Sequence, residues 1–264
     1  MTTRYLSLAA VSFAALGLFA CSSDSSMTGT TGNPSAAVTA EAAMVSSDAM
    51  SSDAQLMMPA AGSANLVSFD DDHGDPSFGC HLAVLRFMCP PRVAGGLTIT
   101  SSITFFDASG AAEAAFDSLL TASMHIDVDI SGTTTHESWQ SDVARHRHFV
   151  VTGLAGVETS RTWNGFGSDT LSRTRVRDTV TREFTVTINT TLTDVVVPVH
   201  GGRHPTSGTA TQVVTMTETS GDQPGKTFTF TATYTFDGTV RIPFLFGGRH
   251  FHLDLDADEA SEDH

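Results

Sequence analysis

The stretch Thr227–Phe236, TFTFTATYTF, decides the fold class of this 264-residue chain. Four aromatic rings and one alanine occupy every second position, and threonines fill the positions between them. Successive side chains of a β-strand point to opposite faces of the sheet, so this segment predicts a strand with one apolar face and one hydroxyl face.

The same alternation recurs along the chain, with turn signals between its copies. The apolar positions of three further strands are Leu97, Ile99, Ile103 and Phe105; Met124, Ile126, Val128 and Ile130; and Phe184, Val186 and Ile188. Turn-forming pairs such as Gly221-Asp222 and Asp237-Gly238 bound such segments. Only Ala111–Leu120 has a helix-forming composition, so βαβ units are excluded.

These strands predict an all-β domain, antiparallel, with roughly eight to eleven strands. Each long strand has one wet face and one apolar face, so the apolar faces must be buried against each other. A single β-sandwich or a barrel-like domain achieves this burial.

Residues 1–20 predict a secretory signal. A short basic start precedes the uncharged, largely apolar run Tyr5–Ala20, which is shorter than the roughly 20 residues of a membrane-spanning helix. The run ends in Leu18-Phe19-Ala20-Cys21, which resembles the lipobox of bacterial lipoproteins. The resemblance implies that residues 1–20 are a lipoprotein signal peptide and that Cys21 carries a lipid anchor. The alternative is an ordinary cleaved signal followed by a chance cysteine.

The segment behind Cys21 predicts a disordered tether over residues 21–64. It is rich in Ser, Ala, Thr, Gly and Met and poor in charge, and such a composition buries too little apolar surface to offset its ordering entropy. The folded β-domain is then expected over 65–255, with an acidic tail at 256–264. Ser22 stands where an Asp would signal inner-membrane retention, which favours the outer membrane in a cell with two membranes.

Two cysteines remain besides Cys21, and an oxidising compartment favours a disulfide between Cys80 and Cys89. A disulfide requires Cα atoms within about 7 Å, so the eight residues between the cysteines must fold back as a hairpin or loop. Leu82–Leu85 contains no turn signal, and two buried thiols are the alternative.

The charge balance narrows the range of partners. Acidic residues outnumber basic ones 29 to 14, which gives a formal charge of −15. Such a surface repels phosphates, so we expect no nucleic-acid binding. The Asp70–Asp75 cluster is expected to be a solvated junction rather than a calcium site, because it lacks the ligand spacing of an EF-hand.

Charged stripes are predicted on several strand faces. They comprise Arg173, Arg175 and Arg177; His125, Asp127 and Asp129; and His146 and His148. We expect these stripes on the wet face of the sheet, where opposite charges on neighbouring strands pair. The alternative for the arginine stripe is binding of an anionic polymer or a lipid headgroup.

The C-terminal segment predicts a hairpin around a two-residue Gly247-Gly248 turn. The turn pairs Phe246 with Arg249, and the same register carries on to Arg241 opposite Asp254. Phe244, Phe251, Ile242 and Leu253 then share the core face.

The opposite face of this hairpin holds the candidate metal ligands, which are His250, His252, Asp254 and Asp256. Imidazole and carboxylate groups can bind a divalent ion such as zinc or copper. Alternate strand residues stand nearly 7 Å apart, so two neighbours can share an ion but four cannot. We therefore favour an acidic edge that opposes aggregation, and we expect no cofactor.

Three functional classes remain. The first is an envelope lipoprotein with a non-catalytic binding, interaction or structural domain, whose partner is an envelope protein, polysaccharide or lipid. The second is a carrier that holds a lipid or other apolar ligand inside an aromatic-lined β-domain. The third is a hydrolase with an unrecognised site. Because no catalytic motif stands out, we expect binding rather than catalysis.

Overall fold

The structure is a computed structural model that describes residues 33–58, 79–156, 158–177, 180–199, 204–256 and 259–262. The expected signal peptide, the lipid anchor on Cys21 and the Asp70–Asp75 cluster all lie outside these residues.

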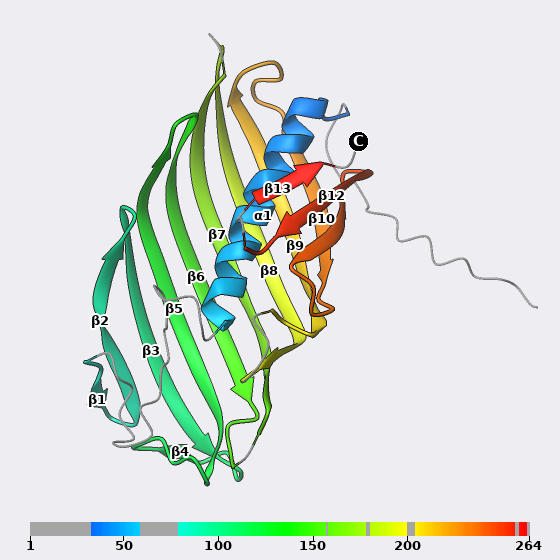
Figure 1. Ribbon diagram of the computed structural model, residues 1–264. Coiled ribbons are helices and arrows are strands. Elements are labelled where there is room, and N and C mark those ends of the chain that lie inside the picture. Colours follow the sequence, from blue (N-terminus) through cyan, green and yellow to red (C-terminus); the bar gives the residue numbers. More distant parts are fainter. Residues whose placement is uncertain are drawn as a thin grey trace, which may run out of the picture.

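A large antiparallel sheet forms most of the described domain (Figure 1). Its ten strands are β1 His81–Ala83, β2 Arg86–Ala94, β3 Leu97–Asp107, β4 Ala112–Glu113, β5 Thr121–His136, β6 Trp139–Thr152, β7 Ser160–Arg177, β8 Val180–Pro198, β9 Ser207–Ser220 and β10 Thr227–Thr235. Nine of them neighbour one another in the order β1-β2-β3-β5-β6-β7-β8-β9-β10, and β4 pairs with β3. The all-β antiparallel prediction is confirmed, and the fold is sandwich-like rather than a closed barrel.

The alternation of the sequence matches the burial of the strands. In β10, Phe228, Phe230, Ala232 and Tyr234 are buried, and the threonines between them are at least partly exposed. We call the face that carries these buried residues the inner face and the opposite one the outer face. The inner face packs against a helix and a smaller sheet (Figure 1).

The helix is α1, Ala36–Met57, and it lies across the inner face (Figure 1). Ser35 caps its N-terminus by accepting a hydrogen bond from the backbone N–H of Val38, and alanine-rich composition favours its helical backbone. Fifteen of its residues are buried. The expectation of a disordered tether is therefore wrong over residues 36–57, and the β-domain expected from residue 65 includes an earlier helix. The remainder of the expected tether lies mostly outside the described residues.

The smaller sheet contains β11 Arg241–Phe246, β12 Arg249–Asp254 and β13 Glu259–Glu262. The β11–β12 hairpin has the predicted register from Phe246 opposite Arg249 to Arg241 opposite Asp254, which confirms that prediction. Both turn glycines have positive φ, 57° and 80°, as a tight hairpin turn requires. The expected acidic tail is wrong over β13, because these residues pair with β12.

Two further expectations concern local structure. Ala111–Leu120 is not helical: β4 and a turn occupy it, and the Asp117 carboxylate accepts bonds from the backbone N–H groups of Leu119 and Leu120. Such aspartate turns compete with helix formation. Cys80 and Cys89 form a disulfide with Cα atoms 3.9 Å apart, and the residues between them fold back as the β1–β2 hairpin.

Candidate functional site

Arginines of β6 and β7 point from the inner face towards α1. Arg145 and Arg147 share the strand phase of the buried residues Phe149 and Val151. Arg173 is buried on β7, and Arg175 is half-buried beside it. The expectation that the arginine stripe is on the wet face is therefore wrong for Arg173 and Arg175, because acidic side chains of α1 neutralise it in the interior.

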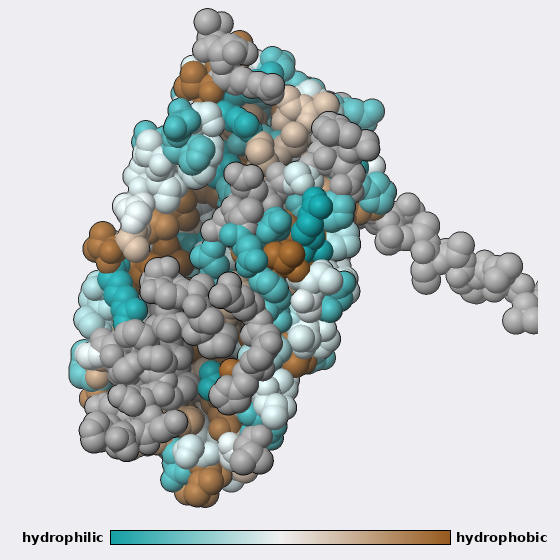
Figure 2. Space-filling view, in the orientation of Figure 1, coloured by the Kyte–Doolittle hydropathy of each residue, from teal (hydrophilic) through white to brown (hydrophobic). Residues whose placement is uncertain are grey.

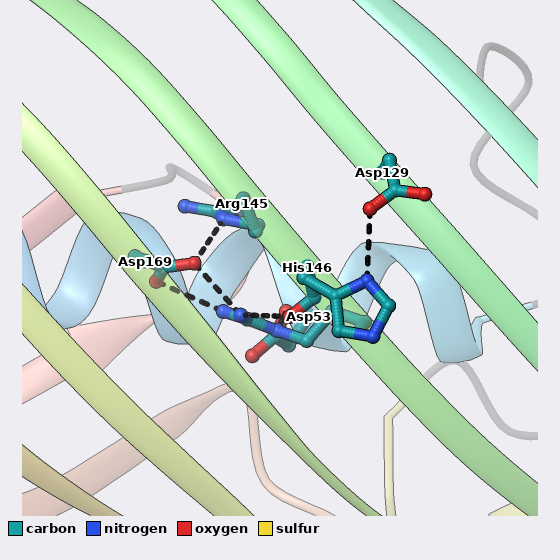
Figure 3. A network of polar contacts seen from close by, with 6 residues as sticks. Asp53, Asp129, Arg145, His146 and Asp169 are labelled. Carbon is teal, nitrogen blue, oxygen red and sulfur yellow. Dashed lines mark hydrogen bonds and ion pairs between the residues drawn. The ribbon is translucent and has the colours of Figure 1, made fainter.

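The first buried cluster joins α1 to both strands through Asp53. Arg147 donates one hydrogen bond of 2.7 Å to Asp53 and two, of 2.7 and 2.9 Å, to the two carboxylate oxygens of Asp169. Arg145 donates one bond of 2.9 Å to Asp169. Figure 3 shows Asp53, Arg145 and Asp169 converging, with strands β6 and β7 in front of α1. Buried charges need such partners, because isolated charges pay a large desolvation penalty.

A glycine makes room for this cluster. Gly167 lies directly opposite Arg147 in the β6–β7 ladder. A Cβ atom at Gly167 would lie 2.5 Å from the carbonyl oxygen of His146 and 2.7 Å from Arg147 Nη1. Real side chains do not approach so closely, so Gly167 allows the arginine head group to lie flat against β7.

The second buried cluster lies nearer the N-terminal end of α1. Arg173 donates hydrogen bonds to Asp48 (2.6 Å), to Ser141 (2.9 Å) and to Glu41 (3.4 Å). Its guanidinium carbon lies 4.2 Å from the centre of the Trp139 ring, a cation–π arrangement. Arg175 also pairs with Glu41. The contacts with Asp48 and Glu41 fix the position of α1 along the sheet, and those with Ser141 and Trp139 hold the Arg173 side chain in place.

A third contact between α1 and the sheet is uncharged. The Ser46 hydroxyl hydrogen-bonds the Gln212 amide oxygen at 2.6 Å and the Tyr234 hydroxyl at 2.8 Å. Burial raises the pKa of Tyr234 far above its ordinary value. The residue therefore stays neutral and acts as a hydrogen-bonding group.

Some polar atoms at this interface have no partner. Among the described residues, Asp53 Oδ2, Arg175 Nε and Gln212 Nε2 are buried and accept or donate no hydrogen bond. Burial raises the pKa of the Asp53 carboxyl, although the charge of Arg147 opposes this shift. Burial likewise raises the pKa of Asp48, and Arg173 opposes that shift. The α1 interface is therefore polar and incompletely satisfied.

A cavity of about 290 Å³ lies beside these clusters, between α1 and strands β3, β5, β6 and β7. Its apolar wall consists of Val45, Leu97, Ile130, Val143 and Leu171. Its polar lining consists of Asp48, Ser51, Ser52, Gln55, Thr134, Trp139, Ser141, Arg145 and Arg173. Figure 2, which views the α1 side of the molecule, shows hydrophobic side chains exposed among hydrophilic ones. A hollow that combines an apolar wall with directed polar groups is typical of a small-molecule site.

The outer face carries the other predicted stripes as cross-strand pairs. His146 bonds Asp129 at 2.8 Å, and His148 bonds Asp127 at 2.7 Å. In each pair the two residues are direct neighbours in the β5–β6 register. The expectation that these stripes lie on the wet face and pair across neighbouring strands is confirmed for these residues.

The predicted metal ligands lie on β12 and in the turn after it. His250 and Asp256 are exposed, and His252 and Asp254 are half-buried. The described part of the chain contains no group of three or more His, Cys, Asp or Glu side chains placed to hold one metal ion. A shared ion between two neighbours stays a prediction.

Sequence reasoning missed most of the charged residues between α1 and the sheet. The missed residues are Glu41, Asp48, Asp53, Arg145, Arg147 and Asp169. For Arg145 and Arg147 a signal existed, because they lie four and two residues before Phe149, respectively, and so share its face. Asp48 lies seven positions after Glu41, about two helical turns, so the two residues share one face once the segment is known to be a helix.

Comparisons of the chain with protein-family models, with curated proteins and with solved structures found no match. Within the described ranges, no helix combines the length and the apolar character needed to cross a membrane. Because no known protein matches, the function of the site is inferred from the chemistry of its residues.

Proposed function

We propose that this protein is a membrane-anchored, non-catalytic binding protein of the cell envelope. Its ligand site is the cavity between α1 and the inner face. The single observation that carries the proposal is the cavity itself, about 290 Å³ in volume, with an apolar wall and converging polar groups.

The anchor supports the envelope location. The lipobox-like ending before Cys21 supports lipidation and retention at a membrane, and Ser22 favours the outer membrane. We expect Cys21→Ala to abolish incorporation of labelled fatty acid and to move the protein out of the membrane fraction. Unchanged labelling in this variant would contradict the anchor and leave the location without support.

The shape of the interior bears on the carrier alternative. Helix α1 occupies the inner face that a long acyl chain would need. The remaining cavity suits a small ligand with a partly apolar body, so a carrier function is favoured only for such ligands. The cavity lining holds serines and a carboxylate without a histidine in the described residues, so no hydrolase is proposed.

Blocking the cavity tests the proposal. The wild-type chain and Val143→Trp are compared by native mass spectrometry after purification from the native envelope, and by thermal unfolding with a panel of small organic molecules. Val143 lines the cavity from β6, so an indole at this position fills the space. We expect bound molecules or raised melting temperatures in the wild type and neither in Val143→Trp. Equal behaviour of the two proteins would contradict the proposal.

Ser52→Trp is a second blocking variant, because Ser52 lines the same cavity from α1 and is only half-buried. Val93→Trp is the matched control, since Val93 is exposed on β2 and does not line the cavity. We expect the control to keep the binding of the wild type.

A further inference from the structure

We infer that the cavity takes a small organic monoanion, whose carboxylate is bound by Arg145 and whose apolar or aromatic body lies along Leu97 and Val143. This inference rests on the proposed function, since it names the ligand class of the same site.

Arg145 is the group suited to such a carboxylate. Its side chain lines the cavity and is only 10% exposed. Its Nε donates to Asp169, and Figure 3 shows this as a single dashed line between the two residues. Within the described part of the protein, its two terminal amino groups donate no hydrogen bond. A guanidinium presents these groups as a planar fork that matches a carboxylate with two parallel bonds.

The other cavity arginine is already occupied. Arg173 donates hydrogen bonds to Asp48, Ser141 and Glu41. Its guanidinium group also lies over the Trp139 ring. A ligand carboxylate would have to break these bonds to reach it. Arg145 is therefore the residue to which the ligand binds without disrupting the α1 interface.

The apolar wall of the cavity suits an apolar ligand body. Leu97 of β3, Ile130 of β5 and Val143 of β6 form one continuous wall, because their strands are adjacent in the sheet. Trp139 adds an aromatic ring to the lining. Removing apolar ligand surface from water here favours binding, and the costs of association oppose it.

The charge balance favours one negative charge over two. The arginines at the α1 interface are Arg145, Arg147, Arg173 and Arg175, and their carboxylate partners are Glu41, Asp48, Asp53 and Asp169. The ligand adds a negative charge to this neutral set in a poorly solvated place. A phosphate monoester would add up to two, at greater desolvation cost.

Asp48 offers a way to absorb the added charge. It lines the cavity, its pKa is raised by burial, and the charged groups near it are Arg173, Arg145 and Glu41. Proton uptake by Asp48 restores neutrality when the ligand binds. Binding of the anion is then expected to tighten as the pH falls from 7 towards 6, and an uncharged analogue is expected to show no such trend.

The test compares 3-phenylpropionate with its uncharged amide, 3-phenylpropanamide. Binding to the full mature chain in phosphatidylcholine nanodiscs is measured by isothermal titration calorimetry. The proteins are the wild type, Arg145→Met, Arg145→Lys, Val143→Trp and Arg86→Met. Arg86 is a matched control, because it pairs with Asp127 on the outer face and is half exposed.

We expect the wild type and Arg86→Met to bind the acid at least about tenfold more tightly than the amide, which corresponds to about 1.4 kcal/mol. Arg145→Met should reduce this ratio to about one, and Arg145→Lys should keep part of it. If acid and amide bind the wild type equally, or if the ratio survives in Arg145→Met, the ligand class is wrong. If Val143→Trp binds both probes like the wild type, the cavity is not the site and the proposed function fails.

Discussion

Arg147 on β6 donates two hydrogen bonds, of 2.7 and 2.9 Å, to the carboxylate of Asp169 on β7, and its Nε donates a third hydrogen bond to Asp53 of α1. The side chain of Arg147 is 1% exposed, so this junction between helix and sheet is dry. Removing one partner of a buried ion pair leaves the other charge uncompensated, which strongly lowers the stability of the protein. Substitutions at this junction therefore have effects large enough to measure.

The first prediction concerns the loss of the central cation. Arg147→Met leaves Asp53 and Asp169 buried with reduced compensation, and we expect the free energy of unfolding to fall by about 3–5 kcal/mol. Arg86→Met removes an exposed pair with Asp127 and should cost at most about 1 kcal/mol. Chemical denaturation measures both. Equal losses in the two variants would show that the junction is not buried.

The second prediction concerns pH. Burial raises the pKa of the Asp53 carboxyl in the folded protein above the ordinary value of 3.8 that applies to the unfolded chain. At a pH between these two pKa values, the folded state binds more protons than the unfolded state. The contribution of Asp53 to the free energy of unfolding therefore increases as the pH falls and decreases as the pH rises. Asp53→Asn cannot titrate, so its stability relative to the wild type should decline as the pH is lowered from 7 towards 4.

Asp107→Asn is the control for this pH dependence. Hydrogen bonds from Ser109 and Ala111 lower the pKa of Asp107, so its contribution is present above 3.8 and is lost at lower pH. The stability of Asp107→Asn relative to the wild type should therefore rise only as the pH falls below 3.8. Parallel trends in the two variants, followed by urea unfolding at several pH values, would contradict the assignment.

The third prediction concerns the glycine beside the junction. Gly167→Ala places a methyl group against Arg147 and the carbonyl oxygen of His146. The arginine must move, which lengthens its bonds to Asp169 and Asp53. We expect a loss of about 1–3 kcal/mol, the usual cost of overpacking. Ser168→Ala is the matched control, because Ser168 is exposed on the outer face of β7, the strand that carries Gly167. Gly225→Ala does not serve as a control, because Gly225 has a φ of 77°, which an alanine rarely adopts.

The fourth prediction concerns the β1–β2 turn. Val84 and Leu85 both have positive φ, 59° and 69°, and Val84 is 92% exposed. Left-handed backbone costs roughly 1–2 kcal/mol for a residue with a Cβ, and Asn-Gly is the preferred pair for such a turn. Replacing both residues with Asn-Gly should raise the free energy of unfolding by about 1–2 kcal/mol. Gly96→Ala, at another positive-φ turn, should lower it, because its Cβ would collide with the backbone oxygen of Thr133.

The alternation of apolar and polar residues along the strands predicted most of the fold. The TFTFTATYTF stretch and its copies predicted the all-β fold, and the Gly247-Gly248 turn fixed the register of the β11–β12 hairpin. Both features depend on local chemistry, since the period of two and the conformational freedom of glycine are visible in single segments.

The candidate site depended on information that local patterns lack. Residues 36–57 have the small and polar composition of a linker, and their burial results from alanines that approach the sheet and acids that meet Arg147, Arg173 and Arg175. Each acid looks solvated when considered alone. The phase shared by Arg145, Arg147 and Phe149 was the available hint that charge enters the interior.

The cavity, the buried ion pairs and the proposed ligand all depend on α1 lying against the inner face. Native-state hydrogen exchange of the full chain tests this most directly, because backbone amides of Ala42–Ala54 are readily compared with those of central strands. The account predicts that α1 amides exchange as slowly as the β6 and β7 amides, through global unfolding alone. Exchange of α1 at the rate of an unstructured chain, with β6 and β7 still protected, would contradict it.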